Sequence, residues 1–409
     1  MADLQLAFVN FKQNAYIVVE GHTQIADRFF IIRAGKVRVT KSAQVIEEEG
    51  GNILGPGDFF SVVSTMSSHL QIETVQAITD VTLISVHKEQ YSQLIKNNAP
   101  VAMKIIMQFS KRMRYLDEAL ARITLKSATT EDPAHLFNIA QYYIQIRQYE
   151  QAYYAYHQYI KYCPNAPDVD RARDIMAKIS RYVHGVRFDY KPDELVRSYP
   201  KNTMLFCENE PGDELFIIQK GSVKITKIQE NKEVLLAVLK TGDIFGEMAL
   251  LESKPRSASA IAYEDCTVMA VNRANFQQMV SSQPQIIARL TTLLAERIWL
   301  IYKQLANTLI EDRLGRAYDM LLMQLERNRI NVNSPQAYLF DFGPKELVTM
   351  LGLPQSDGSS VIAKLIENKF IQIRQDKIFV QNISEISKEV EMFKRLQARE
   401  DYMRSRGAS

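Results

Sequence analysis

The sequence predicts a multidomain α+β protein. Two β-roll (jelly-roll) domains, each ending in a long helix, are expected together with a helical hairpin insert and a winged helix-turn-helix domain. The prediction rests on the length of 409 residues, an internal repeat, and a change of pattern after Glu311. A chain of this length exceeds what one typical hydrophobic core organises, so roughly two to four domains are expected.

The internal repeat is a β-rich segment used twice. RFFIIRAGKVRVTK (residues 28–41) matches ELFIIQKGSVKITK (residues 214–227), with apolar residues alternating on either side of a shared glycine. Such alternation is typical of a strand hairpin. GDFF at Gly57 matches GDIF at Gly242, an offset of 185 residues. We therefore predict one β-roll domain over residues 1–126, the first repeat, and a second over 185–283, the second repeat.

A long amphipathic helix closes each repeat. The helices begin after Pro100 and Pro284, where proline suits the first turn. In the second helix, residues 284–310, apolar or small residues recur at alternating spacings of four and three, at Ile287, Thr291, Leu294, Ile298, Ile301, Leu305 and Thr308. This is a coiled-coil seam, so we expect a homodimer through residues 284–310.

Between the repeats, residues 127–184 carry a helical pattern. Small, aromatic and terminating residues stand at Ala140, Tyr143, Tyr149, Ala152, Tyr156 and Pro164. The segment resembles one tetratricopeptide-like (TPR-like) hairpin, in which small residues let two helices approach and tyrosines fill the gap. One such unit cannot bury its own face, so it is expected to pack on a flanking domain or on a protein partner. A spacer with a tyrosine core is favoured over a peptide-binding groove.

After Glu311 the pattern changes to helix, strand, helix, helix and hairpin. The segments are LGRAYDMLLMQLE, AYLFDF, PKELVTMLG, PQSDGSSVIAKLIENK and FIQIRQDKIFVQ. This order predicts a winged helix-turn-helix domain over residues 311–390, followed by a C-terminal tail over 391–409.

Composition limits the class of protein. The formal net charge is +3, too small to suggest wholesale wrapping of nucleic acid or membrane. Cys163, Cys207 and Cys266 are scattered, with no CxxC pair and no nearby histidine at ligand spacing, so no metal site is expected. No signal peptide or apolar run of about 18 to 20 residues is found, which predicts a cytoplasmic protein without a membrane partner.

The strongest motif is FGEMALLESKPRSASAI, from Phe245 to Ile261. Arg256 supplies a planar cation that can bind two phosphate oxygens, and Glu247 supplies an acceptor for a hydroxyl. Gly246 and the small residues around Ser257 would let backbone amides approach an anion. The alternative is that Glu247 and Arg256 form an ordinary ion pair in a domain that has lost its ligand, but the combined spacing of these residues favours binding.

This motif resembles the phosphate-binding cassette of the cyclic-nucleotide-binding domain in kinase regulatory subunits and in the cyclic-AMP receptor protein (CRP/FNR-type) transcription regulator family. The resemblance implies that Glu247 binds the ribose and that Arg256 and Ser257 bind the cyclic phosphate. The ligand is then a cyclic nucleotide acting as an allosteric ligand, with cAMP and cGMP as first candidates and less usual cyclic nucleotides as alternatives. The ligand-binding residues implied in the cassette are Phe245, Gly246, Glu247, Met248, Ala249, Leu250, Arg256, Ser257 and Ala258.

The family also implies base contacts from the long helix. An ungapped transfer places Ile301 and Tyr302 where base-reading hydroxyls would lie, with Trp299 close by. Tyr302 could bond the base and Trp299 could stack on it. Packing of both side chains in the helix interface is an equal alternative.

The first repeat lacks the charged residues of the cassette. The offset of 185 places Ser61 opposite Gly246, Val62 opposite Glu247, and Gln71 opposite Arg256. We therefore predict a degenerate domain that keeps the β-roll without a cyclic nucleotide, while an altered ligand stays an alternative.

The expected DNA-reading helix is poor in cations. Its exposed start is Gln355 to Ser360, and residues 310–409 carry 15 Lys and Arg against 14 Asp and Glu. Because phosphate attraction dominates affinity, this balance weakens the case for DNA. Polar side chains can still read bases and a few cations can touch phosphates, so the candidate DNA-binding residues are Lys345, Gln355, Ser356, Ser359, Ser360, Lys364, Arg374 and Lys377.

These observations predict a cyclic-nucleotide-responsive transcription regulator whose winged helix binds DNA. The alternative is a cyclic-nucleotide-sensing scaffold whose winged helix and helical insert bind proteins. An enzyme is not expected, because the sequence holds no phosphate loop, metal triad, Ser-His-Asp arrangement or kinase signature.

Overall fold

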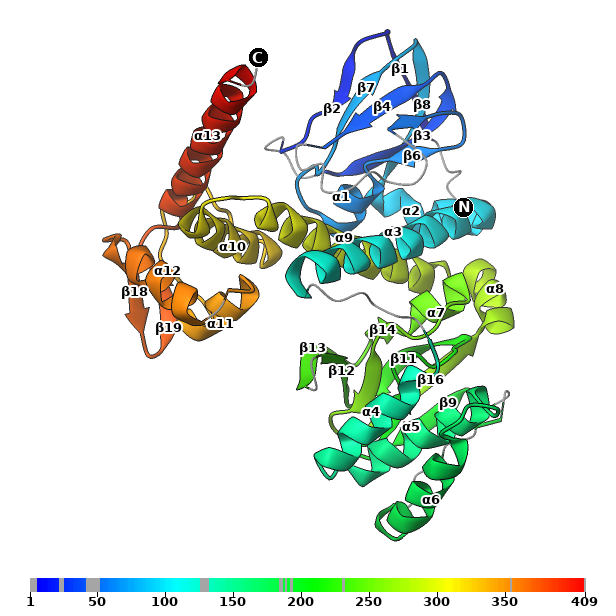
Figure 1. The fold of residues 1–409 in the computed structure, drawn as a ribbon. Coiled ribbons are helices and arrows are strands. Elements are labelled where there is room, and N and C mark those ends of the chain that lie inside the picture. The colour runs from blue at the N-terminus through cyan, green and yellow to red at the C-terminus, as the bar shows by residue number, and fades with distance from the viewer. Residues whose placement is uncertain are drawn as a thin grey trace. The chain divides into compact units, whose positions relative to one another are not determined.

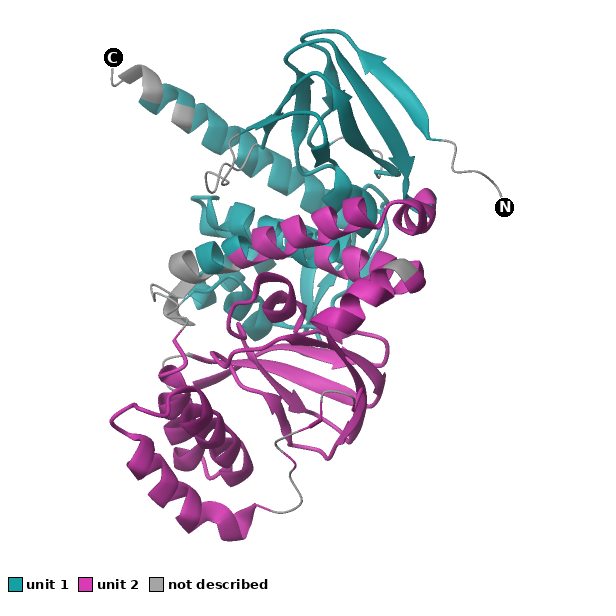
Figure 2. Cartoon of the chain, turned by 90° about the vertical axis from the view of Figure 1, so that its right-hand side faces the viewer, with its two compact units in different colours: residues 1–89, 115–128, 295–409 teal, residues 90–114, 129–294 magenta. Residues whose placement is uncertain are grey.

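The fold is described from a computed structural model (Figure 1). It describes residues 6–21, 26–41, 52–125, 132–183, 187, 190–191, 194–229, 232–353 and 355–407. Two compact units are present (Figure 2). Unit 1 contains residues 1–89, 115–128 and 295–409, and unit 2 contains residues 90–114 and 129–294.

The first repeat forms two four-stranded antiparallel sheets in unit 1, with strand orders β1-β8-β3-β6 and β2-β7-β4-β5. The inward residues of these strands form one apolar core, which includes Ile32, Val37, Val75 and Leu83. The strands and the intervening helix are β1 (Ala7–Phe11), β2 (Tyr16–Val18), β3 (Arg28–Ala34), β4 (Val37–Thr40), β5 (Ile53–Leu54), β6 (Phe59–Phe60), α1 (Val62–Ser67), β7 (Thr74–Ala77) and β8 (Val81–His87).

The second repeat reproduces this arrangement in unit 2. Its sheets have the orders β14-β11-β16-β9 and β10-β15-β12-β13, which correspond strand for strand to those of the first repeat. The elements are β9 (Val196–Tyr199), β10 (Met204–Phe206), β11 (Glu214–Lys220), β12 (Ser222–Gln229), β13 (Lys232–Lys240), β14 (Ile244–Phe245), α7 (Glu247–Glu252), β15 (Ser259–Ala262) and β16 (Cys266–Asn272). The matched apolar alternation in the two sequences therefore produces matched sheets.

Part of the helical segment that follows each roll belongs to the compact unit that contains the other roll. A 3₁₀ turn (Lys88–Gln90), α2 (Tyr91–Asn97) and α3 (Ala99–Leu125) follow the first roll, while α8 (Arg273–Ser282) and α9 (Pro284–Thr308) follow the second. Within unit 2, α2 packs on α8. The Tyr91 hydroxyl lies 3.1 Å from the Thr291 hydroxyl on α9. Helix α3 divides between the units after Arg114, and α9 divides after Leu294.

The helical insert packs on the second roll. It consists of α4 (His135–Gln145), α5 (Tyr149–Tyr162) and α6 (Val169–Ile179), followed by a 3₁₀ turn (Ser180–Tyr182). Its buried tyrosines and alanines share one core with Met204, Cys207 and Ile261 of the roll. The apolar face that a single hairpin cannot cover by itself is therefore covered by the adjacent roll.

The C-terminal segment follows the expected element order in unit 1. Asp312 caps α10 by accepting a bond from the Gly315 amide at 2.8 Å. Two residues with positive φ, Gln375 and Asp376, form the tight turn between the last two strands. The elements are α10 (Arg313–Arg327), β17 (Tyr338–Leu339), α11 (Pro344–Met350), α12 (Gln355–Glu367), β18 (Ile371–Arg374) and β19 (Lys377–Val380), with sheet order β17-β19-β18.

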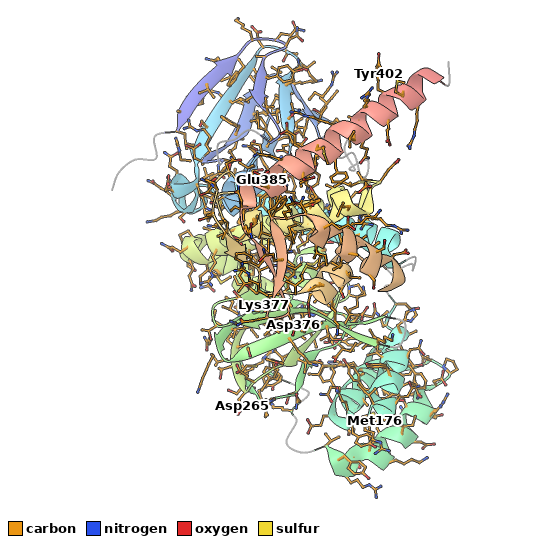
Figure 3. The ribbon with its side chains drawn as sticks, turned by 90° about the vertical axis from the view of Figure 1, so that its left-hand side faces the viewer. Met176, Asp265, Asp376, Lys377, Glu385 and Tyr402 are labelled. Carbon is orange, nitrogen blue, oxygen red and sulfur yellow. The ribbon has the colours of Figure 1, made fainter. Side chains whose placement is uncertain are left out.

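The segment predicted as a C-terminal tail, residues 391–409, continues a helix for most of its length. Helix α13 runs from Ile383 to Gly407, with Glu385 and Tyr402 toward its two ends (Figure 3). Its first turns bury Ile383, Ile386 and Val390, and Arg395 pairs with Glu391 one turn away. Apolar anchoring at one end and charge pairs at helical spacing explain why the helix continues.

The predicted coiled-coil seam of α9 is buried within a single chain. Ile287, Leu294, Ile298 and Leu305 are at most 1% exposed, and Thr291 is fully buried. These side chains are covered by residues of the same chain, and the homodimer through residues 284–310 stays a prediction.

Among the described residues, no helix is long and apolar enough to cross a membrane.

Candidate ligand site in the second repeat

The cassette of the second repeat begins with a sharp turn. Gly246 has φ of 74° and joins β14 to the short helix α7. Its backbone lies in the left-handed region, which glycine enters without steric cost. Glu247 follows as the first residue of α7 and is 2% exposed. The turn thus brings an acidic side chain to a helix start inside the roll.

The Arg256 guanidinium lies in a buried cradle. The residue is 5% exposed, and Nη1 donates to the carbonyl oxygens of Glu214 at 2.7 Å and Gly246 at 2.6 Å. The guanidinium carbon stands 4.2 Å from the ring centre of Phe206 and 5.6 Å from that of Phe216. Aromatic faces stabilise a cation in such positions.

Part of this guanidinium is unsatisfied. Arg256 Nε is buried and has no hydrogen-bond partner among the described residues. A buried donor without an acceptor costs free energy, so such groups call for an explanation by strain or by a missing ligand. An anion in the cassette would supply the acceptor.

Two glycines leave the space that the Arg256 guanidinium occupies. A Cβ atom on Gly212 would lie 2.4 Å from Arg256 Nε, and one on Gly246 would lie 2.7 Å from Nη1. Either added methyl group would push the guanidinium out of place. The glycines therefore determine where the cation sits.

Glu210 is an acidic residue whose backbone is hydrogen-bonded to that of Arg256. The Arg256 amide donates to the Glu210 carbonyl at 2.9 Å, and the Asn209 amide donates to the Arg256 carbonyl at 2.9 Å. Burial raises the pKa of Glu210 to about 7, and Arg256 opposes that rise. Burial also lowers the pKa of Arg256, which nevertheless remains protonated.

The other predicted ligand residues divide into core and surface. Phe245, Met248, Ala249, Leu250 and Ala258 are buried, and the Phe245 ring stacks on Phe216 at 5.3 Å. Ser257 is exposed beside Arg256, and its hydroxyl makes a weak 3.9 Å contact with Met248 Sδ. Only the charged residues and Ser257 thus offer polar side chains to a ligand.

In the first repeat, the region that corresponds to the cassette is occupied by side chains of the protein itself. Ser61 has φ of 64° at the position of Gly246, and its amide donates to Glu73 Oε1 at 2.7 Å. Val62 is buried where the second repeat has Glu247. A carboxylate of the chain itself therefore occupies the start of this cassette, and it would repel an incoming phosphate.

Trp299 and Tyr302 have contacts in unit 1, whereas Arg256 lies in unit 2. The Trp299 ring stacks on His69 with centroids 3.7 Å apart, and the Tyr302 hydroxyl lies 3.4 Å from Glu20 Oε1. Both partners belong to the first repeat. The proposed base contacts of Trp299 and Tyr302 stay a prediction.

The candidate DNA-binding side chains lie on the C-terminal segment. Lys345 on α11, Ser359, Ser360 and Lys364 on α12, and Arg374 and Lys377 on the hairpin are exposed. Gln355 and Ser356 belong to α12, but their side chains lie outside the described set. Asp357 pairs with Arg313 at 3.2 Å, and Arg374 lies over the Phe379 ring and bonds Gln372. Figure 3 shows Lys377 beside Asp376 at the hairpin turn.

One known family model matches both repeats. The family model of the cyclic nucleotide-binding domain matches residues 8–98 and residues 196–283. Each β-rich repeat thus matches a cyclic nucleotide-binding domain. The match supports a cyclic nucleotide as the ligand, as the cassette predicted.

Curated relatives are transcription regulators. The chain is 24% identical over 191 residues to the CRP-like cAMP-activated global transcriptional regulator of Mycobacterium tuberculosis, covering 46% of this chain and 85% of that protein. It is 27% identical over 187 residues to the cAMP-activated global transcriptional regulator CRP of Salmonella typhimurium, covering 45% and 89%. These similarities support the CRP/FNR family at low identity and over about half the chain.

One solved structure matches part of the chain. The catabolite activator protein of Thermus thermophilus matches 51% of this chain and 98% of its own length, at 26% identity and a TM-score of 0.29.

Sequence reasoning missed residues that shape the site from outside the cassette. Glu210 and Gly212 lie in the turn before β11, and Glu252 at the end of α7 binds Ser110 and Arg114 of α3. The glycine stands next to an aspartate in a turn pattern and could have been noticed. The α3 contacts join positions 138 and 142 apart in sequence, for which a single sequence carries no signal.

Proposed function

We propose that the protein is a cyclic-nucleotide-responsive transcription regulator that binds one nucleotide per chain, in the second repeat. The observation that carries the proposal is the buried Arg256 guanidinium with an unpartnered Nε in a cradle of glycine and aromatic residues. A cyclic phosphate would give this cation its missing acceptor. Glu247 would accept a bond from the ribose 2′-hydroxyl.

The geometry around Arg256 leaves donors for a phosphate. Arg256 already donates to two carbonyl oxygens through Nη1, which leaves its other nitrogens for the ligand. The faces of Phe206 and Phe216 close the cradle on one side. Selectivity between cAMP and cGMP would depend on base contacts, for which Trp299 and Tyr302 remain the candidates.

The signal would pass along α3 and α9. Ser110 Oγ and Arg114 Nε bind the two carboxylate oxygens of Glu252 at 2.6 and 2.8 Å, so α3 is tied to the end of the cassette helix. Helix α9 is continuous from unit 2 into unit 1. There Asn307 bonds Asp319 of α10 at 3.0 Å and Lys303 pairs with Glu326 at 2.8 Å.

In this proposal the nucleotide shifts a population between two arrangements of the cassette helix. A ligand changes such an equilibrium only through its different affinity for the two states. The rigid bonds between α9 and α10 would transmit the shift to the C-terminal segment, whose α12 would face DNA.

Because the seam of α9 is already buried, we propose that each chain presents one winged helix and reads one DNA half-site. A homodimer would instead read a palindrome.

Titration calorimetry with cAMP and with cGMP tests the ligand. We expect one site per chain and an affinity loss of at least about 30-fold for Arg256→Ala, since truncating a buried partner of a charge costs several kcal/mol. Arg256→Lys should bind more weakly than wild type because it loses the planar fork. Gln71→Ala, the matched change in the first repeat, should bind normally. Absence of binding by either nucleotide would contradict the proposal.

Selection from random-sequence DNA, with and without cAMP, tests the output. Nucleotide-dependent enrichment of a single half-site supports the regulator as proposed, and enrichment of a palindrome would restore the homodimer. The poor cation content of α12 favours the protein-binding scaffold as second candidate. No enrichment even at low salt, where phosphate contacts are strongest, would select it.

A further inference from the structure

The helical insert reaches the turn that holds Arg256. Tyr154 on α5 is 5% exposed and its hydroxyl points into the second roll. The hydroxyl lies 3.1 Å from the Leu205 carbonyl oxygen and 3.2 Å from Glu210 Oε1. The insert thus has a polar contact inside the roll in addition to its apolar packing.

Glu210 in turn organises the approach to the cradle. Its second carboxylate oxygen accepts from the Cys207 amide at 2.9 Å, which closes the turn formed by residues 207–210. Its backbone carbonyl accepts from the Arg256 amide at 2.9 Å. Two residues later stands Gly212, where an added Cβ would lie 2.4 Å from Arg256 Nε. One turn therefore fixes both the backbone and the side chain of Arg256.

We propose that Tyr154 is a positioning residue for the nucleotide site. Through its bond to Glu210, the helical insert holds the turn of residues 207–212, and with it Arg256, in the geometry that accepts a cyclic phosphate. This rests on the proposed function of the second repeat. It assigns the insert a role in ligand affinity that is separate from any protein partner.

Proton uptake accompanies binding in this arrangement. Tyr154 and Lys161 face Glu210 from the insert, while the Cys207 amide and Arg256 face it from the roll. Burial raises the pKa of Glu210 to about 7, so the group is partly protonated near neutral pH. An arriving phosphate adds a negative charge beside Arg256 and raises this pKa further. Affinity should therefore decrease as the pH rises above about 7.

The side chains contribute to this linkage in different ways. The Tyr154 hydroxyl donates to the carboxylate and favours its charged form. Removing that donor raises the pKa of Glu210 and moves the pH midpoint upward. Replacing Glu210 by Gln removes the titration altogether.

The test is titration calorimetry of the full chain with cAMP and with cGMP between pH 6 and about 8.5, in buffers of different ionisation enthalpy. We expect wild type to take up protons on binding and Glu210→Gln to take up none. Tyr154→Phe should weaken affinity about five-fold, the effect of one hydrogen bond, and shift the pH midpoint upward.

Tyr142→Phe is the matched control. Tyr142 also belongs to the insert, and its hydroxyl accepts from the Glu233 amide of β13 at 2.9 Å, so it bonds the roll at a residue other than Glu210. This variant should keep both the affinity and the pH midpoint of wild type.

Each outcome has a separate meaning. If wild type binds and Tyr154→Phe matches it in affinity and pH profile, Tyr154 is structural only and the inference fails. An equal loss in Tyr142→Phe would also overturn it, since any loosening of the insert would then suffice. If wild type binds neither nucleotide, the proposed function fails and the inference fails with it.

Discussion

The two cassettes have matching backbone elements but contain buried side chains of opposite charge. Both have a left-handed residue, a six-residue helix and a following strand in matching sheet positions. In the second, a cation lies among carbonyl oxygens and rings, while in the first the Glu73 carboxylate takes the amide of Ser61. The strand register places Val18 where the second has Phe206. The proposed difference in ligand binding thus depends on a few side chains within a fold that both repeats share.

The ends of the two cassette helices also differ. Glu252 binds the first repeat's α3 through Ser110 and Arg114. The matching Ser67 bonds its own helix at the Val63 carbonyl, and its neighbour His69 stacks on Trp299 of α9. Each cassette therefore meets the long helix that follows the other repeat. The second does so through buried charge and the first through stacked rings.

The largest expected difference between the cassettes concerns the buried charge. Arg114→Met leaves the Glu252 carboxylate, whose side chain is 7% exposed, without its cation. Breaking a buried ion pair from one side typically costs about 3–5 kcal/mol. We expect a loss of that size in urea unfolding, with faster hydrogen exchange in α7.

Two controls sharpen this test. Ser67→Ala, at the matching position, removes one hydrogen bond and should cost only about 1 kcal/mol. Arg114→Met combined with Glu252→Gln removes both charges and should recover most of the loss. If Arg114→Met costs no more than Ser67→Ala, the ion pair does not distinguish the cassettes.

A smaller effect is expected from the space around Arg256. Gly212→Ala places a Cβ 2.4 Å from Nε, so the guanidinium must shift. Overpacking of this kind costs about 1–3 kcal/mol, which would weaken cyclic nucleotide binding by roughly 10- to 100-fold. The match of residues 28–41 with residues 214–227 pairs Ala26 with Gly212. The reciprocal change, Ala26→Gly in the first repeat, should leave affinity and stoichiometry unchanged. Normal nucleotide affinity in Gly212→Ala would show that the cradle is not limiting.

The sequence was most informative where the candidate functional residues lie close together along the chain. The repeat offset located both rolls. The cassette motif predicted Glu247 and Arg256 as ligand residues, because both stand in one short segment of the sequence. Residues such as Glu210, Tyr154 and Arg114 were missed because they reach the site from other elements. The seam of α9 was recognised by its period, but periodicity does not tell whether a second copy or the same chain covers it.

The stability contributions of the two cassettes should change with pH in opposite directions. Burial, with repulsion from Arg329, Lys303 and Lys88, lowers the pKa of His69 from 6.5 to about 4. Its contribution to stability is full above pH 6.5 and is lost as pH falls toward 4. Burial raises the pKa of Glu210 from 4.5 to about 7. That contribution is full below pH 4.5 and is lost as pH rises through 7.

These shifts are measurable separately. Trp299 is the single tryptophan of the chain, so its fluorescence reports the stack on His69. We expect it to change on acidification toward pH 4, with a stability loss on the order of 2 kcal/mol, and His69→Gln should remove the change. Amide hydrogen exchange of residues 207–210, corrected for the intrinsic pH dependence of exchange, should instead become faster as the pH rises above 7. Glu210→Gln should not show this change. Responses of the same sign would contradict the comparison.

The smallest expected effect tests whether Glu73 alone keeps the first cassette empty. Glu73→Gln retains an acceptor for the Ser61 amide and removes the charge, so unfolding should change by about 1 kcal/mol or less. Nucleotide stoichiometry should stay at one per chain, because Val62 and Gln71 still supply neither the acid nor the cation of the second cassette. A second calorimetric site in Glu73→Gln would mean that a single carboxylate, rather than the loss of the binding residues, separates the two cassettes.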